Sequence, residues 1–157
     1  TEKGYPNTHI DLPLIDTRIM FWIVARYGLD GYYRWGWNAW ATDPYKDPHM
    51  GHPERYGPGD NFVVYPDYKR QKILNSTRWE MMREGMEDYE YLWTLRQVLI
   101  KAKKSGLNVP DPEERIQEIC QRIVKNPTNY TRSPQDIFRV REEIAEEIEI
   151  ILKRTGR

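Results

Sequence analysis

The sequence predicts an α/β protein, and three observations lead to this prediction. The 157 residues are enough for one domain with its own hydrophobic core. Two short β-rich segments, residues 31–36 and 62–65, alternate with segments whose apolar spacing is typical of helices. Strands that alternate with helices favour parallel pairing through crossover helices. Because two strands do not make a stable parallel sheet by themselves, we expect further strands upstream of this chain.

The first helix is expected to run from Asp16, a suitable N-cap, to Tyr27, with Gly28 as its C-terminal stop. Its residues 19–24 are apolar on every side, which predicts a helix that is largely buried.

Three amphipathic helices are expected in the rest of the chain. Thr77 and Glu80 have the spacing of a capping box, for a helix that continues to Lys104 and stops at Gly106. The next two helices begin at Asp111-Pro112 and Ser133-Pro134. Their apolar residues recur at spacings of three and four: Ile116, Ile119, Cys120, Ile123 and Val124, then Ile137, Val140, Ile144, Ile148, Ile151 and Leu152.

The charge balance excludes two classes of partner. Lys plus Arg and Asp plus Glu each number 24, so the chain has no electrostatic reason to bind nucleic acid or an anionic membrane. The longest apolar stretch, residues 19–25, is far shorter than the ~20 residues that span a bilayer. The single cysteine, Cys120, excludes an internal disulfide and sits on a helical apolar stripe, so we expect it in the core.

Aromatic residues are concentrated in the first half of the chain. Of 20 aromatic residues, eleven lie from Tyr27 to Tyr68. Residues 37–60 between the two predicted strands form a long Pro- and Gly-rich segment, and loops of this length are usually functional or disordered. The aromatic content argues against disorder, so we expect a functional loop.

Four segments carry a family resemblance. Residues 76–92, STRWEMMREGMEDYEYL, closely resemble a segment of the family-123 glycoside hydrolases and the uncharacterised domains grouped with them. Residues 11–18, 34–40 and 59–66 resemble three further family motifs in the same order. The second of these matches at Trp35, Asn38 and Trp40 but has Arg34 where the family has an aromatic residue, and the third has Asn61 where the family has glycine. The resemblance covers about residues 10–95.

The resemblance implies a (β/α)₈ barrel of which this chain supplies the C-terminal portion. Residues 1–106 would hold the last two strands and their helices, and residues 107–157 would form a helical extension with two additional α-helices. In such barrels the active site is built from loops at the C-terminal ends of the strands. The chain begins at Thr1 without a methionine, which we interpret as the cut end of a longer protein.

The implied chemistry is removal of β-linked N-acetylgalactosamine by a substrate-assisted, retaining mechanism. In that mechanism the sugar acetamido oxygen attacks the anomeric carbon, and a consecutive Asp-Glu pair on an earlier strand orients it and protonates the leaving group. No Asp is followed by Glu anywhere in this sequence. We therefore expect no catalytic residue here and no activity of this chain alone, but hydrolysis if an upstream half is present. No cofactor is implied, and the compartment stays open, with an extracellular or periplasmic site expected for a bacterial glycan-degrading parent.

The candidate substrate-binding residues are Trp35, Asn38, Trp40, Asp60 and Tyr65. Aromatic faces pack against the C–H groups of pyranose rings, and an amide can both donate to and accept from a sugar hydroxyl or acetamido group. The alternative for the tryptophans is core packing beneath the loop, and for Asp60 a turn before the strand. Trp37 faces the other way if the strand alternation continues.

Other polar clusters have simpler interpretations. His49 and His52 are close in sequence, but their spacing in a Pro-rich loop is weak evidence for a metal, and none is expected. The charged residues from Arg78 to Asp88 are interpreted as a helix surface with ion pairs that hold the helix to its neighbours. Gly85 inside this helix indicates close packing.

Three functions remain open: part of a glycoside hydrolase acting on N-acetylhexosamine-containing glycans, a non-catalytic carbohydrate-binding or degenerate barrel, and a structural or interaction module built on the C-terminal helices. The expected partners are the glycan and the missing N-terminal barrel half. If the chain is complete, residues 19–25 and 61–65 would expose apolar faces, and self-association is expected instead.

Overall fold

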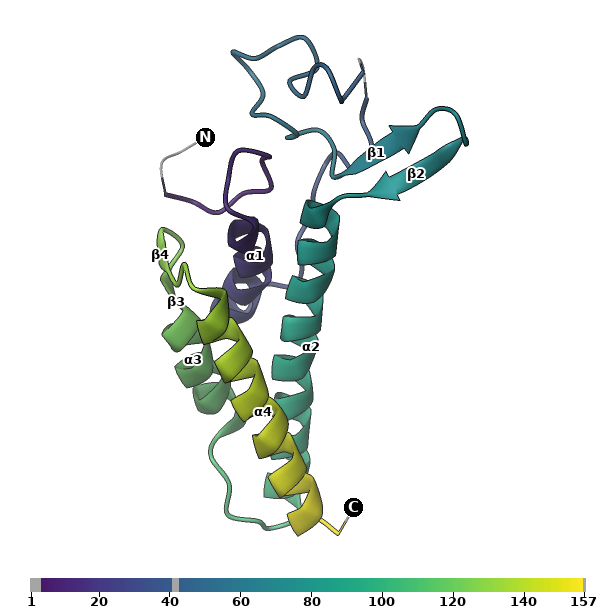
Figure 1. Ribbon diagram of the computed structural model, residues 1–157. Helices are drawn as coiled ribbons and strands as arrows, with labels where there is room; N and C mark the ends of the chain where they lie inside the picture. The colour runs from purple at the N-terminus through teal and green to yellow at the C-terminus, as the bar shows by residue number, and fades with distance from the viewer. Residues whose placement is uncertain (1–3, 41–42, 157) are drawn as a thin grey trace.

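The computed structural model describes residues 4–40 and 43–156, so residues 41 and 42 of the expected long loop lie outside the described residues. Figure 1 shows a helical bundle with the long loop and a β-hairpin gathered at one end. The elements in chain order are α1 (Leu14–Tyr27), β1 (Val64–Asp67), β2 (Lys72–Asn75), α2 (Thr77–Lys104), α3 (Pro112–Ile123), β3 (Val124–Asn126), β4 (Asn129–Tyr130) and α4 (Pro134–Arg154).

The helices confirm the sequence prediction closely, with corrections at two N-termini. Helix α1 begins two residues before Asp16, which lies in the first turn, is buried and accepts a hydrogen bond from Arg132 of the loop before α4. An N-cap prediction for Asp16 was therefore wrong, because its carboxylate is used by a tertiary ion pair instead. The predicted stop is confirmed: Gly28 has φ of +59°, a conformation that costs glycine little.

The cap of α2 lies one residue earlier than the predicted capping box. Ser76 is the N-cap, and its hydroxyl accepts a hydrogen bond from the Trp79 amide at 3.1 Å. Glu80 accepts from the side-chain amide of Asn75 at 2.9 Å. The predicted starts of α3 and α4 are confirmed, with Asp111 as the N-cap of α3 and Pro134 as the first residue of α4.

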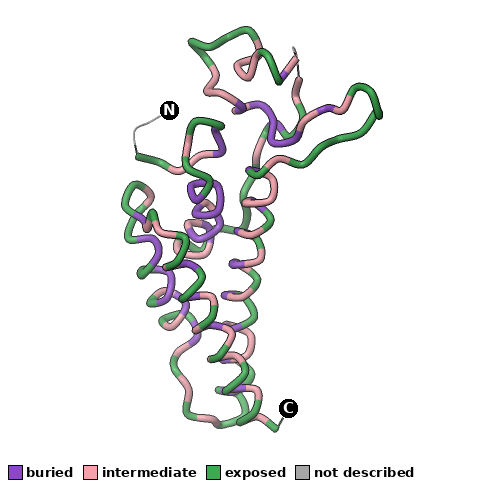
Figure 2. The backbone as a smooth tube through the Cα atoms, viewed as in Figure 1, coloured by how far each residue is buried: buried purple, intermediate pink, exposed green. Residues whose placement is uncertain are grey.

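One hydrophobic core joins all four helices, as the purple inward faces in Figure 2 show. It contains residues from both sides of position 106, among them Ile19, Trp22, Leu95, Leu99, Ile119, Ile123, Ile137 and Ile144. Cys120 belongs to it and is fully buried, which raises the pKa of its thiol to about 12 and leaves it unreactive at neutral pH.

The strands differ most from the prediction. Residues 31–36 form no strand, and the described chain contains two hairpins, β1–β2 and β3–β4, both antiparallel. The second predicted strand is shifted from 62–65 to Val64–Asp67 and passes through Pro66. Proline is tolerated because each strand of a two-stranded hairpin is an edge strand. The chain thus mixes helices with strands, but its strands pair with a neighbour in sequence and not across a helix.

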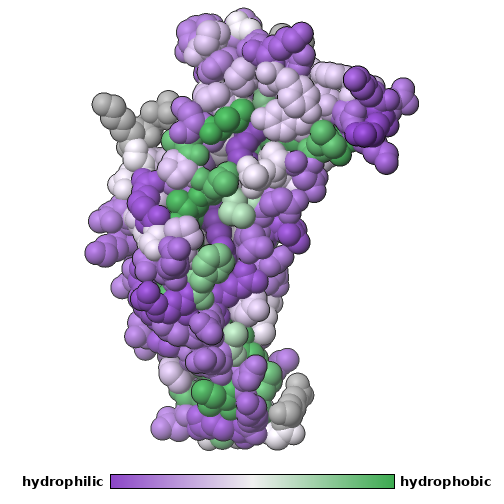
Figure 3. Space-filling model, in the orientation of Figure 1, coloured by the Kyte–Doolittle hydropathy of each residue, from purple (hydrophilic) through white to green (hydrophobic). Residues whose placement is uncertain are grey.

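The apolar segments that we expected to be exposed are covered within the chain. Of residues 19–25 and 61–65, Ile19, Trp22, Phe62, Val63 and Val64 are at most 1% exposed. Exposed apolar side chains lie elsewhere, including Ile73 and Leu74 of β2 at 45% and 43% exposure. Figure 3 shows apolar residues along the face between the bundle and the β1–β2 hairpin. Exposure of residues 19–25 and 61–65 was the reason for expecting self-association, and this reason does not hold. Self-association itself stays a prediction.

A buried ion pair fixes α1 against α2. The guanidinium of Arg18 donates to both carboxylate oxygens of Asp88, at 2.6 and 2.7 Å, and the indole of Trp22 donates to the same carboxylate at 2.9 Å. Arg141 of α4 approaches Asp88 to 3.4 Å and also pairs with Glu87 at 3.1 Å. Arg18 and Asp88 are 3% and 1% exposed, so the predicted helix surface is interior at this point.

Gly85 packs closely against α1, which confirms the close packing that the sequence predicted. A Cβ atom there would lie 2.5 Å from Cδ2 of Phe21 and 2.9 Å from the carbonyl oxygen of Arg18. Real Cβ contacts are not this short, so only glycine allows the two helices this separation.

None of the described helices combines the length and the apolar character needed to cross a membrane.

Asp88→Asn is expected to lower the free energy of unfolding by ~3 kcal/mol, because it removes the bidentate counter-charge of the buried Arg18 and leaves only Glu84, 3.8 Å away. Urea denaturation followed by circular dichroism measures the change. Glu90→Gln, an identical acid-to-amide change at an exposed position of α2, is the control. Equal stabilities of the two variants would contradict the central role of this pair.

Gly85→Ala is expected to destabilise the fold by ~1–3 kcal/mol through overpacking against Phe21 and Arg18. An unconstrained helix would instead gain ~1 kcal/mol from the same change. The sign of the shift in melting temperature decides between the two, and an increase would show that the helices separate without cost.

Candidate functional site

The predicted sugar-binding segments meet at the N-terminal end of α2. Residues 37–39 run beside residues 61–63: the Ala39 amide donates to the Asn61 carbonyl at 3.1 Å, the Val63 amide donates to the Trp37 carbonyl at 2.9 Å, and Asn38 forms a bridge with Phe62. Figure 1 shows these segments with the long loop above α2. Side chains that are 20 to 30 residues apart in sequence are therefore held in one region.

Trp35 and Asn38 present their side chains to solvent. Trp35 is 54% exposed, and its ring centroid lies 6.5 Å from that of Tyr56 in the long loop. Asn38 is exposed beside the bridge to Phe62. An exposed indole supported by a second ring offers a flat apolar face, and the nearby amide offers a donor and an acceptor.

Trp40 has a structural contact that the sequence did not reveal. Its indole N–H donates to the Val64 carbonyl at 3.0 Å, and the side chain is half-buried. This bond ties the end of the 34–40 segment to the start of β1. Trp37, by contrast, packs edge to face on Trp79 of α2, with ring centroids 5.9 Å apart.

Tyr65 stands in an aromatic cluster at the base of the hairpin. Its ring lies 5.1 Å from Tyr45 and 5.3 Å from Phe62, and the Tyr45 hydroxyl donates to the Pro66 carbonyl at 3.1 Å. Tyr45 was not among the predicted residues, although it belongs to the aromatic-rich loop that the sequence analysis singled out.

Asp60 lies on a polar side of the same region. Its carboxylate is 3.3 Å from Nε2 of His9, a ring that is only 6% exposed. A Cβ on Gly57 would clash with that ring, since it would lie 2.3 Å from Cε1. The His9 ring, Asp60 and residues 57–59 are thus packed into one unit, and Asp60 combines a turn position with a partly exposed carboxylate.

Two arginines were missed as members of this region. Arg78, which we had placed on the helix surface, is 4% exposed and donates to the carbonyls of Thr8 and Gly59 at 2.7 and 2.9 Å. Burial lowers the pKa of its guanidinium, the adjacent Tyr65 hydroxyl opposes this effect, and the nearby charge of Arg34 adds to it. The sequence contains one indication that these arginines belong to the site: Arg34 and Arg78 lie in segments 34–40 and 76–92, which resemble family motifs.

The histidines of the long loop are engaged separately. His49 Nδ1 lies 2.8 Å from the Tyr56 carbonyl, while His52 lies 3.4 Å from Glu54. Within residues 4–40 and 43–156 no three His, Cys, Asp or Glu side chains are placed to hold a metal ion.

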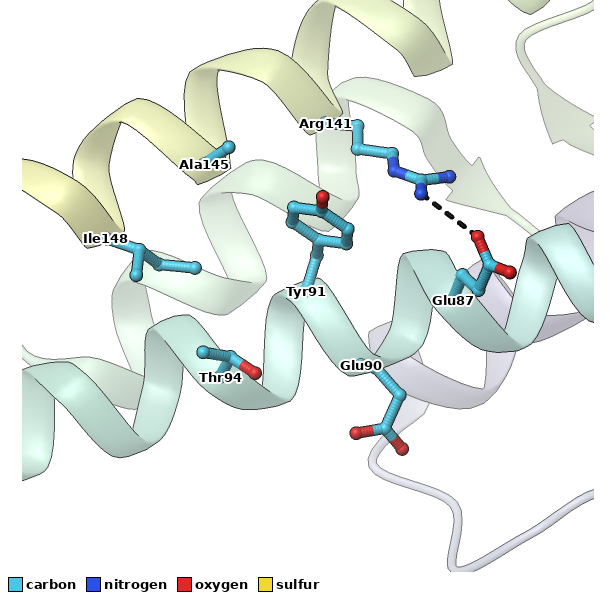
Figure 4. Close-up of a pocket in the computed structure, with 7 residues that line it drawn as sticks. All are labelled: Glu87, Glu90, Tyr91, Thr94, Arg141, Ala145 and Ile148. Atoms are coloured by element: carbon cyan, nitrogen blue, oxygen red, sulfur yellow. Dashed lines mark hydrogen bonds and ion pairs between the residues drawn. The ribbon is translucent and has the colours of Figure 1, made fainter.

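A second recess lies away from these residues, between α2 and α4. It has a volume of about 520 Å³ and its wall is formed by Glu87, Glu90, Tyr91 and Thr94 of α2 with Arg141, Ala145 and Ile148 of α4. Figure 4 shows the Glu87–Arg141 ion pair closing one end and Tyr91 standing between the helices. Its wall carries charged groups, but Glu87 and Arg141 are paired with each other and the Arg141 guanidinium also packs over the Tyr91 ring, 4.6 Å from its centroid, so these groups already have partners inside the protein.

Residues 1–95 match the family described as glycoside hydrolase 123, catalytic domain. The matched range includes every predicted sugar-binding residue and the first part of α2, through Leu95. None of the curated proteins compared with the chain matches it.

Trp40→Phe is expected to cost ~1 kcal/mol of stability, because the Val64 carbonyl loses its donor. Trp93→Phe, at an exposed tryptophan on α2, serves as the control in the same urea titration. If Trp40→Phe is as stable as the control, the hydrogen bond to Val64 does not hold the segment in place.

Proposed function

The chain belongs to the glycoside hydrolase 123 family, and from this premise we propose that it forms the substrate-binding part of an enzyme that acts on β-linked N-acetylated amino sugars. The observation that carries the proposal is the exposed indole of Trp35, which contacts the half-buried Tyr56 ring, with the exposed Asn38 three residues later in the same segment. The indole face would pack against the apolar side of a pyranose, and the Asn38 amide would bind a hydroxyl or the acetamido group.

In this proposal the residues described here bind and orient the sugar but do not carry out the chemistry. A substrate-assisted mechanism needs one carboxylate to orient the acetamido group and another to protonate the leaving oxygen. The sequence contains no consecutive Asp-Glu pair. We therefore propose that this pair is supplied by residues outside the 157, in the N-terminal part of a barrel whose C-terminal portion is residues 1–106.

A second candidate is a carbohydrate-binding domain without catalysis. The absence of the Asp-Glu dipeptide from the sequence favours it equally. The two candidates separate by experiment: both require sugar binding by this chain, but only the first requires hydrolysis of a chromogenic N-acetylgalactosaminide once an upstream partner is added.

Trp35→Ala is expected to weaken binding of N-acetylgalactosamine about tenfold, the equivalent of ~1.4 kcal/mol, because one stacking face is lost. Isothermal titration calorimetry measures the affinity. Tyr33→Ala removes an aromatic side chain that is 85% exposed in the same segment and serves as the matched control. Unchanged affinity of Trp35→Ala, with the protein still folded, would argue against both sugar-binding candidates.

A further inference from the structure

Two arginines in the candidate site share their hydrogen-bond acceptors. Nη2 of Arg34 and Nη1 of Arg78 both donate to the Gly59 carbonyl, at 3.1 and 2.9 Å. Both side chains also bind Thr8, Arg34 through the hydroxyl and Arg78 through the carbonyl. The two guanidinium groups are thus held side by side by neutral oxygen atoms.

Neither arginine has an acidic partner in the part of the chain that the structure describes. Arg18, the other arginine that is more than nine-tenths buried, pairs with Asp88. Asp60 follows Gly59, whose carbonyl the two arginines share. Its carboxylate is directed to His9. Two like charges are therefore placed together with no carboxylate of the described residues in ion-pair contact with either, an arrangement that is costly when one of them is 96% buried.

Unused hydrogen-bonding atoms lie in the same region. Nη2 of Arg78 is buried without a hydrogen-bond partner, and so are both side-chain amide atoms of Asn61, a residue with no exposed surface. Buried polar atoms of this kind cost ~1–3 kcal/mol each, and native proteins rarely keep them without a reason. The unused N–H groups of Arg78 and Asn61 are donors, which suit an oxygen-rich anionic group.

We propose that the Arg34–Arg78 pair and Asn61 form a subsite for an anionic substituent of the glycan, a carboxylate or a sulfate ester. Arg34, Asp60 and Tyr65 of the cluster are half-buried. In the proposal the anion binds from this side and neutralises the two guanidinium charges. The inference rests on the proposed function and specifies its substrate class as acidic sugars.

Three sugars test the proposal on the intact chain by isothermal titration calorimetry at constant ionic strength: N-acetylgalactosamine, its 6-sulfate, and galacturonate. At least one acidic sugar is expected to bind ten times more tightly than N-acetylgalactosamine. Equal affinities would overturn the subsite and leave the proposed function standing. Tight binding of an acidic sugar with no binding of N-acetylgalactosamine would support the subsite and overturn the N-acetylated substrate.

Variants test whether these residues cause the preference for an acidic sugar over N-acetylgalactosamine. Arg78→Gln is expected to abolish this preference. Arg83→Gln, which removes the same charge from an exposed position of α2, is expected to keep it. Because Arg78→Gln removes hydrogen bonds to Thr8 and Gly59 and could unfold the region, Asn61→Ala provides a second test, with a loss of about threefold or more expected. A preference that survives in a folded Arg78→Gln or in Asn61→Ala would contradict the assignment. Inorganic sulfate binding as tightly as the sulfated sugar would show an ion site unrelated to glycans and would also overturn it.

Discussion

The carboxylate of Asp88 accepts hydrogen bonds from Arg18 and Trp22 of α1, and Arg141 of α4 approaches it from the other side. Three helices therefore converge on one buried charge near the middle of α2. A buried ion pair adds little net stability over an apolar replacement, but a misplaced helix would leave its charges unpaired. We infer that the pair sets the register of α1 on α2, while Gly85, one turn earlier, sets their separation.

That register determines where the candidate site is built. With α1 fixed, the segment before it brings Thr8, His9 and Ile10 over the N-terminal end of α2, where Arg78 binds the Thr8 carbonyl and the Ile10 amide donates to Pro58. Trp79 in the next position supports Trp37. The long loop has turn hydrogen bonds of its own, such as that from the Gly59 amide to the Pro48 carbonyl, and Arg78 and Trp79 attach its two ends to α2.

The sequence was sufficient for the helices because their signals are local. Apolar spacing, Pro134 and the glycines at 28 and 106 act within a few residues of the ends that they determine, and the capping error at Ser76 was one residue. The strands were not predictable in the same way. Residues 31–36 are β-rich but pair with no strand. Lys72–Asn75 is exposed and alternates weakly, yet it forms strand β2 because it pairs with its neighbour β1.

For the candidate site, too, the sequence predicted the segments but not the tertiary contacts of their side chains. The motif comparison selected segments that do lie together, but it could not show which side chains have other partners. Trp40 is bound to Val64 and Asp60 to His9, whereas Trp35 remains open. Arg78 was misjudged because a charged residue in the first turn of a helix is usually solvated, and its burial depends on Thr8, 70 residues earlier in the chain.

Helix α2 extends beyond the part of the chain that matches the family. At 28 residues it extends ~42 Å, and the similarity to the hydrolase family ends at residue 95, partway along it. Leu99 and Ala102 lie beyond that point, yet they are fully buried against the C-terminal helices. The family match therefore stops inside a continuous helix and not at a boundary between two packed units. A substitution in α3 or α4 that shifts α2 would also move Arg78 and Trp79, which contact the candidate site from the other end of the same helix.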